Sequence, residues 1–336
     1  VVKPGDLAID IEEGSVGLSP SRTLFEAPVK ARLLLKSKTM GQLVAVAMGP
    51  SPKIAGGLSG ALVVSGTVGK PRAAGDIDLN DLAVTQAQPG CPDPKQRTLT
   101  LGPVKLNAVY ENDRVAGRPV TTTLAGGTIT TNLTATLDRG VHVTFGDLAV
   151  KGLSLEKVLV DYLCQGYAVT GPLDLMGTVS FSAADMWKTL SGSGKLAIGS
   201  GRIVGAQALA LLGGVTRVGG AVSSLLSADL PPSLFASPLE FESITGTYTA
   251  KNGVVTTRDL LYTSPAMKVA VAGTYNVASG AMNLDMVVNT GRNEVQAKVT
   301  GTAASPSIRV NPASVLKNVD PGQVEKGLQD LLKRFR

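Results

Sequence analysis

The sequence is poor in the residue types on which most catalytic and metal sites depend. Its 336 residues include one histidine, His142, and two cysteines. A Ser–His or Cys–His nucleophile would have to converge on that histidine, and zinc-ligand spacing cannot be built around it. His142 stands in the alternating segment GVHVTFGDLAV, which favours an exposed position on a strand. We therefore expect no enzyme activity, no metal and no cofactor.

Charge of one sign is not concentrated anywhere in the chain. The formal net charge is +6, but the basic residues stand singly, and aromatic residues make up only 4% of the sequence. Nucleic-acid binding needs a concentrated basic footprint, with interleaved aromatic residues where bases are stacked. We therefore expect no nucleic-acid partner.

Long hydrophobic runs are also missing. No stretch of about 18 apolar residues occurs, so we expect no membrane-spanning helix in this chain. The first residues, VVKPGDLAIDIEEG, begin inside strand-like sequence without an initiator Met. This beginning predicts a processed or excised fragment, with any targeting or anchoring helix upstream of it.

The C-terminal residues 313–336 predict an amphipathic helix. Asp320 precedes Pro321, a pair typical of a helix N-cap and first helical position. The helix is too short to cross a bilayer, and we expect it to close the end of a sheet. Its apolar stripe comprises Val324, Leu328, Leu331, Leu332 and Phe335.

Most of the remaining chain alternates apolar and polar residues in short segments separated by turns. The 39 glycines and 19 prolines make turns frequent, and Asn252-Gly253 is typical of a tight antiparallel hairpin. Two segments, SGTVGKP (65–71) and TGTAASP (300–306), share Gly-Thr followed four residues later by Pro, with 169–181 as a looser relative. The pattern predicts a mainly β fold with an elongated antiparallel sheet.

A few short helices are expected beside the sheet. Residues 154–163 place Leu155, Val158, Leu159 and Tyr162 on one stripe, and the pattern of 205–226 predicts two short helices interrupted by paired glycines.

Two segments resemble ligand-binding motifs. DIDLND (76–81) resembles the start of a calcium loop, but Asp81 stands where the loop needs glycine, so alternation explains it better. GSGRIVG (199–205) lacks the spacing and context of a phosphate loop, and we interpret it as a hairpin end.

The alternating strands predict a set of apolar residues that share one face of the sheet. Such a face either packs against a second sheet as a sandwich core or stays open as a groove for apolar ligands. The residues alone favour the sandwich. Lys268, Asp285 and Lys298 should then point away from this face. The candidate groove residues are Leu62, Val64, Ile77, Leu79, Val179, Phe181, Leu196, Ile198, Val269, Val271, Met282, Leu284, Met286, Val295, Ala297 and Val299.

Cys91 and Cys164 stand 73 positions apart in turn-like contexts. A disulfide and two free thiols are both compatible with the sequence, because pairing cannot be read from two positions. An oxidising compartment would permit the bond.

Three segments carry a family resemblance. Residues 191–214 (SGSGKLAIGSGRIVGAQALALLGG), 243–276 and 299–310 arrive in the order typical of the AsmA family, and the chain resembles that family's C-terminal periplasmic region. The resemblance implies that the antiparallel sheet is curved and of the β-groove or open-barrel type. It also implies an AsmA-like β domain over 126–312, with 1–125 as a strand region continuing the sheet and 313–336 as the terminal helix.

The resemblance also implies a function. Members of this family are related to bridge-like lipid transfer proteins: an inner-membrane helix anchors a periplasmic body whose curved sheet shields acyl chains between the two membranes of a diderm, Gram-negative bacterium. The implied activity is non-enzymatic lipid binding or transfer that supports outer-membrane lipid homeostasis, with phospholipid or another acyl lipid as partner. An alternative is an assembly factor for outer-membrane proteins, which would use exposed strand edges to contact envelope proteins.

Overall fold

The fold is mainly β and antiparallel, as the sequence predicts, and the sheet does not close on itself. The chain divides into two compact units: unit 1 comprises Val1–Cys164 and Leu173–Gly194, and unit 2 comprises Gln165–Pro172 and Lys195–Arg336. The predicted boundary after residue 125 lies in the turn between two strands of unit 1. The computed structural model describes residues 7–21, 23–41, 53–88, 91–138, 140–164, 168–204, 240–265, 267–290, 293–302 and 305–311.

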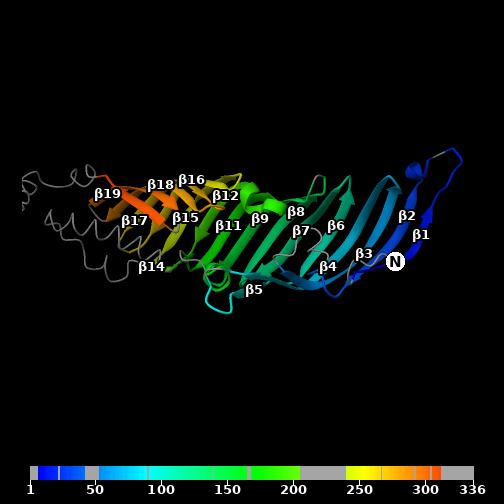
Figure 1. Ribbon diagram of the computed structural model, residues 1–336, viewed down its shortest axis with the longest axis horizontal. Coiled ribbons are helices and arrows are strands. Elements are labelled where there is room, and N and C mark those ends of the chain that lie inside the picture. Colours follow the sequence, from blue (N-terminus) through cyan, green and yellow to red (C-terminus); the bar gives the residue numbers. More distant parts are fainter. Residues whose placement is uncertain are drawn as a thin grey trace, which may run out of the picture. The chain divides into compact units, whose positions relative to one another are not determined.

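Unit 1 is an antiparallel meander (Figure 1). The strands pair in the order β1–β2–β3–β4–β6–β7–β8–β9, β11 pairs with β9, and β5 pairs with the end of β4. The first half of β12 (Ser191–Ile198) also belongs to this unit. The other strands are β1 (Ala8–Val16), β2 (Val29–Ser37), β3 (Lys53–Thr67), β4 (Lys70–Ala87), β5 (Gln96–Thr100), β6 (Val104–Glu111), β7 (Arg114–Leu124), β8 (Gly127–Thr136), β9 (His142–Ser154) and β11 (Pro172–Ser182).

Unit 2 contains a second meander and a small three-stranded sheet. The small sheet has the order β10–β13–β14, formed by Ala168–Val169, Gly201–Val204 and Glu240–Phe241. Asn252 and Gly253 have φ angles of 51° and 76°, which confirms the predicted tight hairpin between β15 and β16. The meander runs through β15 (Ser243–Lys251), β16 (Val254–Thr263), β17 (Lys268–Asn276), β18 (Ala281–Thr290), β19 (Asn293–Thr302) and β20 (Ser305–Val310).

The two echoed sequence segments have the same local geometry, one in each unit. Gly66 lies opposite Pro71 with φ of 96°, and Gly301 lies opposite Pro306 with φ of 94°. In each hairpin a threonine hydroxyl accepts a hydrogen bond from the backbone N–H three residues later: Lys70 N–H to Thr67 and Ser305 N–H to Thr302, both at 3.2 Å. The short repeat in the sequence is therefore a repeated hairpin in the structure.

Short helical turns interrupt the strands. The predicted helix over 154–163 is confirmed as η2 (Glu156–Tyr162), although its geometry is that of a π-helix, with the Leu163 N–H bonded to the Val158 carbonyl. The turns η1 (Leu24–Glu26), η3 (Ala183–Asp185) and α2 (Met186–Thr189) were not apparent from the sequence. The expected helices in 205–226 and 313–336 lie outside the described residues.

Within the described ranges, no helix combines the length and the apolar character needed to cross a membrane.

Asp259 stabilises an irregular part of the hairpin between β15 and β16. The register of β15 against β16 shifts between Thr245 and Thr249, and the Asp259 carboxylate accepts hydrogen bonds from the Thr247 N–H and hydroxyl, each at 2.8 Å. These bonds, the backbone one first, lower the pKa of Asp259 from its usual value. The ionised form is therefore bound more favourably in the folded protein than in the unfolded chain.

Asp259→Asn should lower the melting temperature at pH 7. A depressed folded-state pKa contributes stability above the unfolded value, about 3.9, and that contribution disappears as the pH falls through the folded pKa. The difference in melting temperature between the variant and the unmodified chain should therefore shrink below about pH 4. Asp10→Asn, at an exposed carboxylate of β1, is the control. A difference that is constant from pH 7 to pH 3 would contradict this role of Asp259.

Candidate functional site

Unit 1 presents an apolar face formed by rows of cross-strand partners. Residues directly opposite each other in an antiparallel pair share a face, so the register defines each row. One row crosses the unit from β1 to β9 and contains almost only apolar or glycine positions. Its members are Ile11, Leu33, Leu62, Gly75, Ala108, Gly117, Leu133 and Phe145.

Neighbouring rows extend the same face. Ile77 lies opposite Leu106, Leu79 lies opposite Val104, and Val64 belongs to a row that continues through Ala73 and Tyr110. Phe181 joins the face because its ring centroid is 6.0 Å from that of Phe145. Val179, two residues before Phe181 on β11, shares its side of the strand. The six candidate groove residues of unit 1 therefore share one apolar face.

The opposite face of unit 1 is mainly polar. Asp76, next to Ile77 in the sequence, accepts a hydrogen bond from the Asn107 amide at 3.0 Å. Asp78 lies opposite Lys105 in the next row. The alternation in DIDLND is thus structural, as predicted, and the calcium-loop interpretation is wrong for this segment. No group of three His, Cys, Asp or Glu suitable for a metal occurs among the residues that the structure describes.

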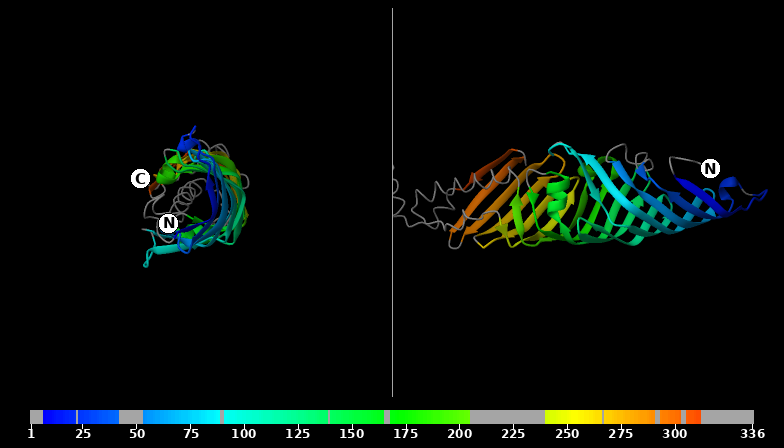
Figure 2. Two further views of the ribbon diagram at one scale, coloured as in Figure 1. Left: turned by 90° about the vertical axis from the view of Figure 1, so that its right-hand side faces the viewer. Right: turned by 90° about the horizontal axis from the view of Figure 1, so that it is seen from below.

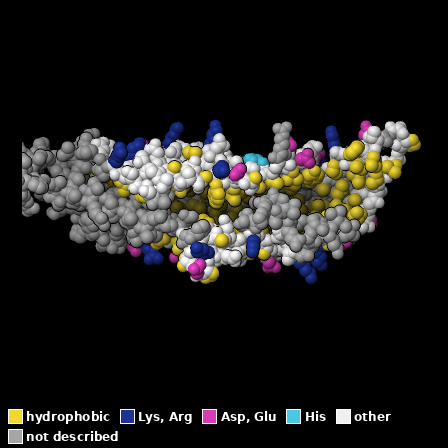
Figure 3. Space-filling view, viewed as in Figure 1, with side chains coloured by type: hydrophobic (Ala, Val, Ile, Leu, Met, Phe, Trp, Pro, Cys, Tyr) yellow, Lys and Arg dark blue, Asp and Glu magenta, His cyan; other side chains and the backbone are white. Residues whose placement is uncertain are grey.

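The apolar face lies on the concave side of the unit 1 sheet. Figure 2 shows the strands of this unit, coloured blue to green, curving into an arc. Figure 3 looks into the hollow of that arc, which hydrophobic side chains line. Leu62, Val64, Ile77 and Leu79 are half-buried. In the described part of unit 1 no second sheet covers them, so the face is not the interior of a closed sandwich.

Part of this face is packed more tightly. Leu82, Val104 and Val120 form a buried cluster where β4, β6 and β7 meet. Partly buried neighbours surround the cluster: Met40, Leu79, Leu101, Leu106 and Leu133. The concave face is thus more tightly packed around this cluster than at Leu62 and Val64.

Unit 2 has its own apolar face, built by the same alternation. Val271 lies opposite Met286, which lies opposite Ala297, and Leu284 lies opposite Val299. Met282 is on the same side of β18, and Val269 and Val295 are linked across the sheet through Val288. Val299 is only 2% exposed, and Val269 and Ala297 are 7% exposed each. These three residues are more deeply buried than the candidate groove residues Leu62, Val64, Ile77 and Leu79 of unit 1.

The charged residues of unit 2 point to the other face. Asp285 lies opposite Lys298, and the Lys298 ammonium is 3.0 Å from the Asp285 carboxylate in an exposed ion pair. Lys268 is exposed as well. The register is therefore the one that alternation predicts. On β12, Leu196 and Ile198 share one side of the strand, and Ile198 is buried.

Other sequence-derived expectations can be located. His142 is exposed at the start of β9, opposite Thr136, as predicted. In GSGRIVG, two residues separate the end of β12 from Gly201, where β13 begins. The expected hairpin end is wrong, because β12 and β13 do not pair with each other: β13 pairs with β10 and β14 in the small sheet.

Several residues of the unit 1 face were missed by sequence reasoning. Leu33 and Leu35 belong to it, but the run Leu33–Leu35 hides the alternation because Leu34 faces the other way. Leu106, Leu133 and Phe145 follow clear alternation and were detectable. The polar threonines between such residues weaken the hydrophobic signal without changing its period.

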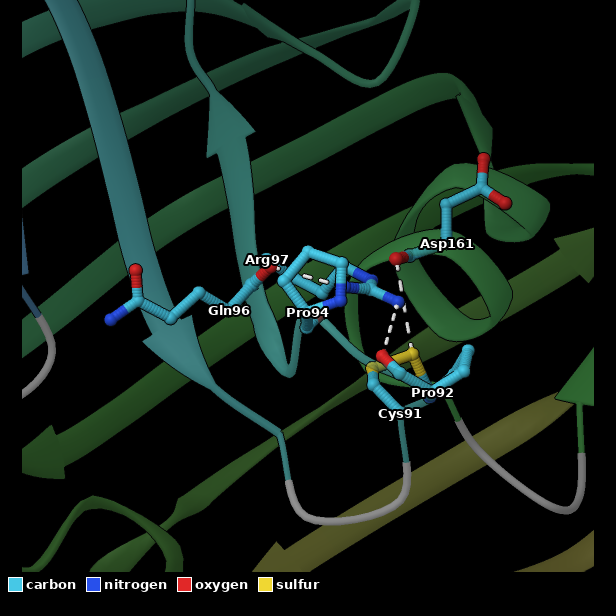
Figure 4. Close-up of a disulfide and its surroundings, with 7 residues drawn as sticks. Cys91, Pro92, Pro94, Gln96, Arg97 and Asp161 are labelled. Carbon is cyan, nitrogen blue, oxygen red and sulfur yellow. Dashed lines mark hydrogen bonds between the residues drawn. A yellow bond between two sulfur atoms is a disulfide. The ribbon is translucent and has the colours of Figure 1, made fainter.

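Cys91 and Cys164 form a disulfide in unit 1, with their Cα atoms 5.2 Å apart (Figure 4). Cys91 lies in the segment between β4 and β5, and Cys164 follows η2. Arg97 holds the first segment by donating to the carbonyls of Pro92 and Gln96 at 3.1 Å each, and to that of Pro94. The bond therefore links the connection between β4 and β5 to the segment that follows β9. In the sheet, the ends of β7 and β8 lie between these two segments.

Replacing both cysteines, Cys91→Ser with Cys164→Ser, should destabilise the protein. The bond closes a loop between positions 73 apart, which contributes roughly 4 kcal/mol in the chain-entropy treatment. Denaturant unfolding of the double variant measures the loss, and the unmodified chain in reductant should behave like it. Unfolding midpoints that match with and without the bond would contradict a stabilising role.

The hydroxyl of Tyr248, in unit 2, is buried and has no hydrogen-bond partner among the described residues. Tyr248 lies on the same, more buried side of β15 as Ile244 and Ala250. Burial raises the pKa of its phenol. Tyr262 differs, because its hydroxyl donates to the Glu240 carbonyl at 3.2 Å. The two tyrosines form a natural comparison of an unpaired and a paired hydroxyl.

Tyr248→Phe should leave stability unchanged or raise it, because it removes a polar atom that lacks a partner. Tyr262→Phe, the matched control, should lower the free energy of unfolding by about 1 kcal/mol, since a hydrogen bond is lost. Denaturant unfolding of both variants gives the comparison. A loss for Tyr248→Phe equal to that for Tyr262→Phe would show that the Tyr248 hydroxyl is paired.

Comparisons with protein-family models, with curated proteins and with solved structures find no match to this chain.

Proposed function

We propose that this protein is a non-enzymatic lipid-binding and lipid-transfer module whose apolar sheet face shields acyl chains. The observation that carries the proposal is the concave face of unit 1. It is apolar along successive rows, and no second sheet covers it in the described part of the unit. Its candidate groove residues Leu62, Val64, Ile77 and Leu79 are half-buried. A contiguous apolar surface that no second sheet covers among the described residues is typical of a binding site.

Acyl chains fit this surface better than a polar ligand does. Each methylene transferred from water is worth about 0.8 kcal/mol, so a chain of many methylenes is held without any specific polar contact. The sheet backbone is satisfied by its own ladders, so only side chains need to face the lipid. The polar groups of unit 1, such as Asp76 and Asn107, face the opposite side.

The cellular setting is part of the proposal. The disulfide between Cys91 and Cys164 supports an oxidising compartment, because such bonds are rare in the cytosol. The resemblance to the AsmA family supports a periplasmic location, with the full-length protein anchored in the inner membrane by an upstream helix. The lipid partner would then be a phospholipid or another acyl lipid of the cell envelope, and the role would be outer-membrane lipid homeostasis.

Lipid extraction of the purified chain followed by mass spectrometry tests the proposal, and phospholipid should be recovered with the protein. Two adjacent positions on β3 give a matched pair of variants. Leu62 is half-buried on the apolar face, whereas Val63 is 60% exposed on the other face. Leu62→Asp should sharply reduce bound lipid, because it places a charge where acyl chains lie, and Val63→Asp should not.

Circular dichroism and melting curves of both variants test whether they fold. Where Leu62→Asp does not fold, Leu62→Ser takes its place. Absence of lipid from the unmodified chain, or equal lipid in the folded Leu62 and Val63 variants, would sink the proposal.

A second function is favoured by the edge of unit 1. All nine residues of β1 are exposed although the strand pairs with β2 along its length. An exposed strand is a template for strand addition by another chain. In the same purification, an assembly factor for outer-membrane proteins would retain an envelope protein rather than lipid.

A further inference from the structure

Exposed hydrophobic side chains are concentrated at one place in unit 1. Of the eleven large hydrophobic side chains that are exposed among the described residues, six fall between positions 9 and 25. Three of them lie in the connection between β1 and β2: Leu18 is 76% exposed, Leu24 61% and Phe25 71%. Chance scattering of surface hydrophobics does not explain this density.

The connection, described at 17–21 and 23–28, is held in a defined conformation. Thr23 and Glu26 form a capping box around η1, in which the Glu26 carboxylate accepts from the Thr23 N–H and hydroxyl at 3.0 Å each. The Gly69 N–H donates to the Phe25 carbonyl at 2.9 Å, and the Val68 N–H donates to the Ala27 carbonyl at 3.0 Å. Ala27 is 1% exposed. Leu24 and Phe25 are therefore displayed by a built turn.

This turn projects at the end of the unit 1 sheet beyond β1 (Figure 1). It is also continuous with the apolar face. Val16 and Val29, the last residues of β1 and the first of β2, lie opposite each other, followed along the same side by Gly14 with Ala31 and then by Ile11 with Leu33. Ile11 and Leu33 belong to the apolar row already described. An apolar path thus leads from the projecting turn to the concave face.

We propose that the connection between β1 and β2 inserts Leu18, Leu24 and Phe25 into the interfacial layer of a phospholipid bilayer. This inference rests on the proposed function: if acyl lipid binds the concave face, the apolar path from that face to the turn makes lipid the partner of the turn as well. An apolar surface that is continuous with the headgroup layer would let an acyl chain leave the bilayer without exposing its methylenes to water. The turn supplies that meeting point at one end of the face.

The shape and charge of the turn fit a bilayer better than a protein groove. Side chains that stand out from a projecting turn reach a flat lipid surface while the strands stay in water. Two exposed lysines, Lys30 and Lys70, flank the turn, and Lys70 follows the glycine that bonds to Phe25. Anionic headgroups attract such lysines. Apolar insertion with flanking cations is the pattern of proteins that lie on a membrane surface.

A single-tryptophan variant tests the insertion directly in the full chain. The sequence has one tryptophan, Trp187, so Phe25→Trp combined with Trp187→Phe places the only reporter in the turn. Vesicles of phosphatidylcholine with phosphatidylglycerol should shift its emission to the blue. Pure phosphatidylcholine vesicles should give the same shift at higher lipid concentration.

Sedimentation with the same vesicles gives a second measurement. Leu24→Gln with Phe25→Gln should weaken binding at least tenfold, whereas Val63→Gln, at an exposed valine on the polar face of β3, should not change it. Equal binding by the two variants, or no blue shift at saturating lipid, would overturn the insertion. A blue shift that grows with protein concentration without vesicles would also overturn it, because the turn would then contact a second copy of the chain.

The outcome is separable from that of the proposed function. Co-purified phospholipid without vesicle insertion defeats the turn's role and leaves the lipid-binding face intact. Insertion without any lipid carried by the protein defeats the lipid-transfer function and leaves a membrane-contact site.

Discussion

The fold depends on the two-residue period of side chains in paired strands. In unit 1 the row through Leu62, Leu133 and Phe145 stays apolar across eight strands only because every register agrees. If the register of any strand shifted by one residue, its apolar side chains would face solvent and its polar side chains would face the concave side. The burial of the concave face therefore holds the register, and the register in turn keeps the face continuous.

The curvature of unit 1 is accommodated by positions without side chains. A Cβ atom added to Gly60 would lie 2.6 Å from the Asp76 carbonyl oxygen, so β3 and β4 approach more closely there than a side chain allows. Gly117 stands in the long apolar row, and the register of β7 against β8 shifts just after it. Glycines and bulges are the usual means by which a sheet bends. The curvature of the apolar face is thus encoded in part by glycines that stand within the face itself.

Much of this could be predicted from the sequence. Alternation around Ile77 and Leu79, and around Met282 to Met286, fixed both the β class and the side of the sheet that each residue occupies, because periodicity is a local property. The hairpin at Asn252-Gly253 followed from turn chemistry. Whether the face is open or covered depends on distant segments, so alternation alone favoured a sandwich and the family resemblance favoured a groove. In the described part of unit 1 no second sheet covers the face. The projecting turn with Phe25 was missed because its order comes from hydrogen bonds to residues between β3 and β4, far along the chain.

The disulfide has a mechanical consequence for the sheet of unit 1. It makes a covalent ring of the chain between Cys91 and Cys164, which includes β5 to β9 and η2. Tension applied at the two chain ends passes across the sulfur–sulfur bond and does not reach the interior of that ring. About 250 Å of extensible chain, at roughly 3.5 Å per residue, is thereby withheld from stretching. The middle of the apolar face would keep its shape under a load that peels strands from either end.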